Sequence, residues 1–126
     1  MKKILYIDAD EISAILFKKS TLRMVPFKVA VTVSEKTAVA EIALTNDKFD
    51  LVISQLYSID GIDLIRNLRE GNYGDNNKNV PAIAISSIGL IGTEDKCLHV
   101  GFNACVTIPD IKHLLAKEIN KIFAEK

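Results

Sequence analysis

Apolar segments and amphipathic segments alternate along the whole chain, and this alternation constrains the fold more than any other feature. Short apolar runs predict strands at residues 4–7, 27–33, 51–55, 82–85 and 104–107, and a helical pattern follows each of them. Strands that alternate with helices form a parallel sheet with helices on both faces and right-handed crossovers. The sequence therefore predicts one α/β, doubly wound domain with a parallel five-stranded sheet.

The individual runs indicate where each strand lies. Residues 51–55 are apolar on both faces, which is typical of a central strand, whereas residues 27–33 alternate between apolar and polar side chains, which suits an edge strand. Asp10 and Ser34 precede the first two helical patterns and are expected to cap them. The last helix begins after Pro109 and carries a broad apolar stripe.

Composition excludes several classes of function. The 126 residues suit a single domain, and 16 Lys and Arg balance 16 Asp and Glu, so no overall charge recruits nucleic acid or anionic lipid. The apolar runs are too short to span a membrane, and the first of them ends too early for a signal peptide. Cys97 and Cys105 match no metal or disulfide spacing, so we expect two reduced thiols in a cytoplasmic protein.

Polar side chains end two of the predicted strands. Asp8 and Asp10 follow the first strand, and Gln55 ends the third. The carboxyl ends of parallel strands meet at one edge of the sheet, which is where ligands bind in open α/β folds. A site that combines acids on one strand with a neutral amide on its neighbour differs chemically from a site with acids on both strands.

Five segments together resemble the receiver domain of bacterial response regulators, over essentially the whole chain. They are KKILYIDADE (residues 2–11), FDLVI (49–53), DGIDLI (60–65), VPAIAISS (80–87) and GFNACVTIP (101–109). The resemblance implies a single receiver-like domain over residues 1–126, with a flavodoxin-like (βα)5 fold and strand order 2-1-3-4-5. Receiver domains accept a phosphoryl group on an Asp with bound Mg²⁺ and then change a face that docks partners.

The residues that carry this chemistry in receiver domains are largely replaced. Gln55 stands where the resemblance implies the phosphoryl-accepting Asp, Ala9 where it implies a metal-binding acid, and Ile108 where it implies a Lys. Asp8 and the hydroxyl of Ser86 are retained. The resemblance therefore implies that these five residues form a degenerate phosphorylation pocket, with no catalytic residue. The resemblance also implies a cis bond between Ile108 and Pro109.

Asp8 and Asp10 are the weak candidates for a divalent cation, because Mg²⁺ prefers hard oxygen ligands. Capping of the first helix explains Asp10 equally well. We therefore predict no metal site and no cofactor, and residual metal binding stays open.

The pattern favours a pseudo-receiver, a non-enzymatic module of two-component signal transduction that binds proteins without phosphorylation. One alternative is a working but unorthodox phosphoacceptor receiver with weak metal binding. Another is a small-ligand-binding flavodoxin-like domain, although no Gly-rich phosphate loop follows the first strand. No Ser–His or Cys–His pairing suggests a nucleophilic enzyme.

The expected partner is a protein of unknown identity, neither nucleic acid nor membrane, and a weak homodimer stays open. The resemblance implies a docking face on the fourth helix, fifth strand and fifth helix, which would present Lys96, His99, Cys105, Lys112, Lys117 and Lys121. The alternative is a solvated, locally basic surface that keeps the domain soluble.

Overall fold

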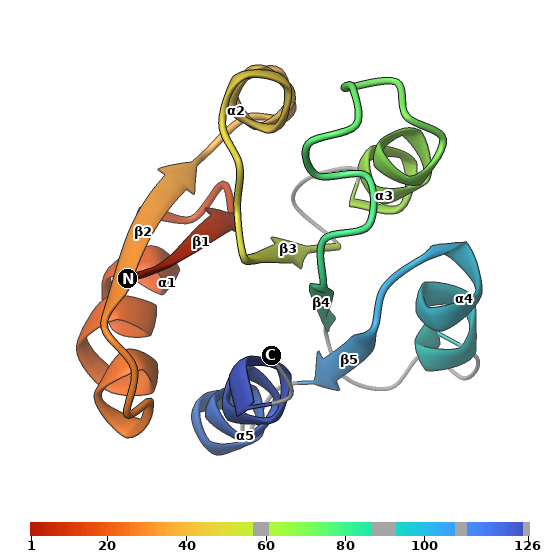
Figure 1. The fold of residues 1–126 in the computed structure, drawn as a ribbon. Coiled ribbons are helices and arrows are strands. Elements are labelled where there is room, and N and C mark those ends of the chain that lie inside the picture. Colours follow the sequence, from red (N-terminus) through yellow and green to blue (C-terminus); the bar gives the residue numbers. More distant parts are fainter. Residues whose placement is uncertain (57–60, 87–92, 108–110, 125–126) are drawn as a thin grey trace.

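A computed structural model of the chain describes residues 1–56, 61–86, 93–107 and 111–124. Five strands and five main helices alternate, as the sequence predicts (Figure 1). The elements are β1 (Lys2–Ile7), α1 (Glu11–Leu16), β2 (Val29–Ser34), α2 (Thr37–Asn46), β3 (Leu51–Gln55), α3 (Gly61–Arg69), β4 (Ala82–Ser86), α4 (Thr93–Val100), β5 (Ala104–Thr107) and α5 (Ile111–Ala124). A π-helical turn, η1 (Phe17–Thr21), and a 3₁₀ turn, η2 (Leu22–Met24), continue α1.

All strand pairs are parallel, and the sheet order is β2-β1-β3-β4-β5. This confirms the flavodoxin-like order 2-1-3-4-5, with β3 in the centre and β2 at an edge. In Figure 1, α2, α3 and α4 cover one face of the sheet, and α1 and α5 cover the other. The central strands β3 and β4 are buried along their whole length, because helices cover both of their faces.

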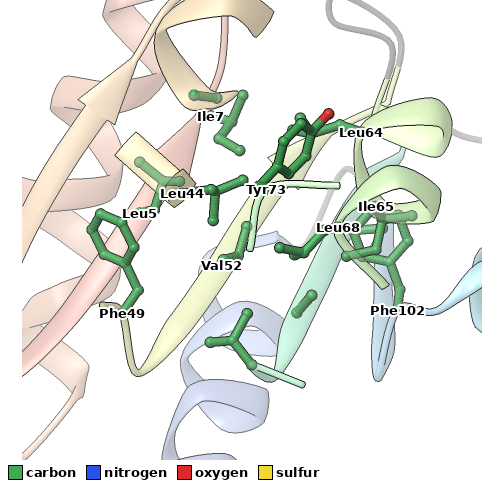
Figure 2. Close-up of a cluster of buried hydrophobic side chains, with 14 of the residues drawn as sticks. Leu5, Ile7, Leu44, Phe49, Val52, Leu64, Ile65, Leu68, Tyr73 and Phe102 are labelled. Atoms are coloured by element: carbon green, nitrogen blue, oxygen red, sulfur yellow. The ribbon is translucent and has the colours of Figure 1, made fainter. Parts of the chain in front are cut away.

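Each face of the sheet carries its own hydrophobic core. On the face of α2, α3 and α4, strand residues such as Leu5 and Val52 pack against Leu44, Leu64 and the ring of Phe102, among others (Figure 2). The second core packs the other side of the strands against α1, η1 and α5. Burial of apolar surface of this extent is the main stabilising contribution to such a domain.

Of the two predicted helix caps, one is confirmed and the other is wrong. Asp10 caps α1, since its carboxylate accepts hydrogen bonds from the Ile12 amide at 3.0 Å and the Ser13 hydroxyl at 2.9 Å. The prediction for Ser34 is wrong. Ser34 is the buried last residue of β2, and Lys36 occupies the position before α2. The β2 strand runs one residue past the predicted end because Ser34 still pairs with Ile7 of β1.

The polar segment between α3 and β4 is more ordered than its composition indicates. Asn77 is buried and holds this segment to the entry of β3: its side chain accepts a hydrogen bond from the Phe49 amide at 2.8 Å and donates to the carbonyls of Leu44 at 2.8 Å and Asp47 at 2.6 Å. Arg69 at the end of α3 donates to the carbonyls of Gly101 and Lys78. Asn77 therefore ties this segment to the connection between α2 and β3, and Arg69 ties it to the end of α3.

Within the described ranges, no helix has the length and apolar character needed to cross a bilayer. Cys97 is buried and Cys105 half-buried, and both are thiols rather than disulfide partners, as the sequence predicts.

Candidate functional site

Asp8 lies immediately after β1 and is fully buried. Its backbone amide donates to the Ser34 carbonyl at 3.0 Å, which fixes the residue beside the end of β2. One carboxylate oxygen, Oδ1, accepts a hydrogen bond from the Asp10 amide at 2.9 Å, and the other, Oδ2, accepts one from the Tyr6 hydroxyl at 3.3 Å. The carboxylate is thus held by donors from its own strand and from the start of α1.

Gln55 ends β3 and is only 2% exposed. Because Ile7 of β1 pairs with Ser54 of β3, the next residues on the two strands, Asp8 and Gln55, lie side by side at the edge of the sheet. The Gln55 side chain is close enough to Asp8 to lower the pKa of its carboxyl. Its own oxygen, Oε1, is buried and has no hydrogen-bond partner among the described residues. The Asp8–Gln55 pair forms the centre of the candidate site.

Burial raises the pKa of Asp8 above its ordinary value of 3.8, because the charged form loses its hydration. Hydrogen bonds from the Asp10 amide and from the Gln55 and Tyr6 side chains oppose this effect, and the nearby Asp10 carboxylate adds to it. The balance is a buried acid that is harder to ionise than a solvated one. A strongly bound cation would have the opposite effect on the pKa.

Ser86, the hydroxyl residue that the resemblance implies for the pocket, is the last residue of β4. Ser86 is buried, and its Oγ lies 3.6 Å from Sγ of Cys105 on β5. Cys105 is half-buried rather than fully buried, since β5 is an edge strand. The thiol therefore fills space beside Ser86 with a small, weakly polar group.

The donor set around Asp8 does not fit Mg²⁺. Ala9 is exposed and offers no side-chain ligand, and both carboxylate oxygens of Asp10 are engaged in capping α1. Among the described residues, no three acids, histidines or cysteines cluster as a metal site would require. Since Mg²⁺ favours six oxygen ligands in near-octahedral geometry, the site lacks the carboxylates that hold this ion in proteins. Ile108, and with it the Ile108–Pro109 bond, lies outside the described residues.

The residues of the predicted docking face lie on three neighbouring elements. α4 and α5 both contact β5, and they cover opposite faces of the sheet (Figure 1). Lys96 and His99 are exposed on α4, Lys117 and Lys121 on α5, and Cys105 lies between the helices on β5. The side chain of Lys112 lies outside the described part of the structure. Asp95 is also exposed on α4, so an acidic side chain interrupts the basic surface.

Two residues of the site were not identified from the sequence. Tyr6 is two residues before Asp8 on β1, and residues at this spacing point to the same face of a strand, so its hydroxyl was within reach of the acid. Gly61 opens α3 so close to β3 that a Cβ atom there would lie 2.8 Å from the Gln55 carbonyl oxygen. Only glycine lets α3 start this close to the Asp8–Gln55 pair.

No protein-family model matches the chain, and no curated protein matches it in sequence. Solved structures do match. The receiver domain of a response regulator from Francisella is 21% identical, with a TM-score of 0.81 over 99% of this chain and 98% of that one. The signal receiver domain of a DNA-binding response regulator from Colwellia psychrerythraea 34H is 20% identical, with a TM-score of 0.83 over all of both chains.

A third similar structure is the receiver domain of a sensor histidine kinase from Pseudomonas aeruginosa PAO1. It is 20% identical, with a TM-score of 0.79 over 98% of each chain, and it contains a magnesium ion coordinated in the active-site cleft. At these identities the likeness establishes the fold. The chain has the flavodoxin-like fold of response regulator receiver domains, across its whole length.

Proposed function

We propose that this chain is a receiver-like signalling domain that binds a protein partner without a phosphorylation step. The observation that carries the proposal is the buried amide side chain of Gln55 at the end of β3, beside Asp8 at the end of β1. Gln55 occupies the end of β3, where a phosphoryl-accepting carboxylate is expected from the resemblance. An amide nitrogen is not nucleophilic, so this position cannot accept a phosphoryl group.

The metal chemistry of a working receiver is also unsupported by the side chains present. The Pseudomonas receiver domain holds magnesium in its cleft. In this chain the acid pair that the resemblance implies is reduced to Asp8, whose two oxygens already accept hydrogen bonds from the Asp10 amide and the Tyr6 hydroxyl. These donors take up part of the acceptor capacity of the carboxylate, and Ala9 supplies no second acid ligand beside it. The side chains present therefore give little support to the alternative of an unorthodox phosphoacceptor with weak metal binding.

The replacement of acids at positions 9 and 55 is consistent with a pocket that has lost its metal as well as its phosphoryl acceptor. An unpaired buried charge costs several kcal/mol, about 3–5 when one partner of a buried pair is removed. Gln55 and Ala9 stand where two further carboxylates would add to the repulsion that Asp10 already exerts on Asp8, so fewer negative charges need a cation at this site. We interpret the pocket as one rebuilt for structural integrity rather than for phosphoryl transfer.

The surface that we assign to partner binding is the one formed by α4, β5 and α5. Its exposed cations, Lys96, Lys117 and Lys121, favour an acidic partner surface, whereas half-buried Cys105 on β5 packs against the core on the α4 side. Complementary charge increases the rate of association and makes it fall as salt rises. The affinity of this chain for the partner would then be the same before and after the chain is exposed to phosphoryl donors.

Intact-mass spectrometry tests this proposal. After incubation with acetyl phosphate and Mg²⁺, we expect the mass of the chain to stay unchanged, whereas a working receiver domain treated in parallel gains one phosphoryl group. The same treated and untreated samples are then compared for binding to the partner identified by affinity capture. A stoichiometric phosphoryl adduct, or a partner affinity that depends on the treatment, would contradict the proposed function.

A further inference from the structure

The outer face of the first helix carries apolar side chains that nothing in the described structure covers. Ile12 is 67% exposed, Leu16 is 56% exposed and Ile15 is 44% exposed, although the inner face of the same helix is well packed through Ala14 and Phe17. Single exposed apolar residues are common, but three at helical spacing form a continuous stripe. We call Ile12, Ile15 and Leu16 the α1 stripe.

Charges of opposite sign flank the α1 stripe at its two ends. Glu11 is exposed at the start of α1, and Lys18, Lys19 and Arg23 are exposed on the turns that continue it. None of these four residues forms an ion pair within the described part of the chain. The face is therefore bipolar, acidic at one end and basic at the other, on a chain whose net charge is zero.

We propose that the α1 stripe is a self-association surface, on which a second copy of this chain packs its own α1 in antiparallel orientation. A twofold axis near Ile15 would bring each Glu11 close to Lys18 and Lys19 of the other copy, because these residues lie at similar distances on either side of the axis. The same arrangement aligns the two helix dipoles favourably. The apolar stripes then meet at the centre, with the Lys stems covering their ends.

The size of the surface makes the expected dimer weak. A stable interface buries about 800 Å² per partner, and three partly exposed side chains supply less than that. We therefore expect a dissociation constant between about 10 µM and 1 mM, in the range of transient complexes. This interaction uses α1, away from the α4–β5–α5 surface, so it is independent of the proposed function.

Sedimentation velocity of the full chain over a range of concentrations up to about 1 mM tests the inference. We expect the sedimentation coefficient to rise with concentration, and this rise to weaken at least about tenfold in Ile12→Ser/Leu16→Ser. The matched control is Val39→Ser/Ile42→Ser, which removes side chains of similar exposure, 47% and 62%, from α2 on the other face of the sheet. The control should associate like the parent chain.

A charge exchange tests the antiparallel geometry separately. Glu11→Lys and Lys19→Glu should each weaken self-association, and Glu11→Lys/Lys19→Glu should restore it, because the two charges still meet with opposite sign across the twofold axis. Melting temperatures of all variants show that they remain folded. A chain that is monomeric at every concentration overturns the inference, as does association that survives Ile12→Ser/Leu16→Ser. If Glu11→Lys/Lys19→Glu does not restore association, the inference is also overturned. In that case the stripe would be the docking site of a different protein.

Discussion

Gln55 at the end of β3 lies beside Asp8 at the end of β1, and its side chain opposes the rise in the pKa of Asp8 that burial causes. Both residues are buried, so this contact forms in an environment where an unpaired charge is costly. The amide supplies a donor where a second acid would supply only repulsion. The pair therefore places one acid and one neutral amide, rather than two acids, at this edge of the sheet.

Replacing Gln55 by Asp should destabilise the fold without restoring phosphorylation. The new carboxylate would face Asp8, and two neighbouring buried carboxylates cannot both ionise at low cost. We expect Gln55→Asp to lower the free energy of unfolding by about 1–3 kcal/mol at pH 7, measured by urea denaturation. The loss should shrink as pH falls, because protonation of either acid removes the repulsion.

Gln55→Asn is the matched control for that variant, since Asn and Asp have the same shape and differ in charge. We expect Gln55→Asn to be the more stable of the two at pH 7 and the two to converge in acid. Equal stability at neutral pH, or efficient phosphorylation of Gln55→Asp by acetyl phosphate, would show that this account of the pocket is wrong.

The raised pKa of Asp8 predicts a pH dependence of stability. Between the ordinary value of 3.8 and the higher folded-state pKa, the folded protein binds more protons than the unfolded chain. The contribution of Asp8 to the free energy of unfolding therefore falls as pH rises through this range, and it stays low at neutral pH. Asp8→Asn removes this titration.

Urea denaturation of the parent and of Asp8→Asn at a series of pH values from about 3 to 8 checks this prediction. The stability of Asp8→Asn relative to the parent should increase as pH rises above the ordinary Asp value and then level off. A relative stability that decreases over the same range would mean that Asp8 is stabilised in its charged form, as by a bound cation.

Asn77 should contribute strongly to stability although it lies in a polar segment. Asn77→Ala leaves the buried Phe49 amide and the Leu44 carbonyl without their side-chain partner. We expect the free energy of unfolding to fall by about 3 kcal/mol, because buried polar groups left unpaired cost about 1–3 kcal/mol each. Asn76→Ala changes an exposed neighbour and should have an effect within about 0.5 kcal/mol.

Charge reversal on α5 should weaken partner binding and leave the fold intact. Lys117→Glu/Lys121→Glu removes two exposed cations from the proposed docking surface. We expect the association rate for an acidic partner to fall at least about tenfold at low salt, with a melting temperature within about 2 °C of the parent. Lys36→Glu/Lys48→Glu makes the same charge change near the two ends of α2 and is the control. Equal loss in both variants would place the docking surface elsewhere.

The periodicity of the sequence predicted a parallel five-stranded sheet, and the arrangement of apolar residues predicted β3 as a central strand. The strand order followed from the resemblance to receiver domains and is confirmed. Ser34 was assigned wrongly because a Ser before a helical pattern is a frequent cap, whereas pairing with Ile7 extends β2 to include it. Asn77 could not be distinguished by composition from the exposed residues around it. Its burial depends on contacts with Leu44, Phe49 and Asp47, which are about 30 residues away in the chain.

The candidate site was predictable in its location but not in its contacts. Strand polarity placed Asp8 and Gln55 at one edge of the sheet. The direction of the Gln55 amide and the contribution of Tyr6 depend on side-chain rotamers and on the β1–β3 register, which no local pattern specifies. The π-helical turn at Phe17–Thr21 was likewise outside what a regular helical period predicts.

The amide spectrum of the isotope-labelled chain, recorded with Mg²⁺ alone and with Mg²⁺ plus beryllofluoride as a phosphoryl mimic, tests the central claim most directly. If the Asp8–Gln55 pair has replaced phosphoryl chemistry, the resonances of Asp8, Gln55 and Ser86 stay where they are at millimolar concentrations of both reagents. Saturable shifts at these three residues would contradict the account, because they would show that the pocket still binds a metal and a phosphoryl group.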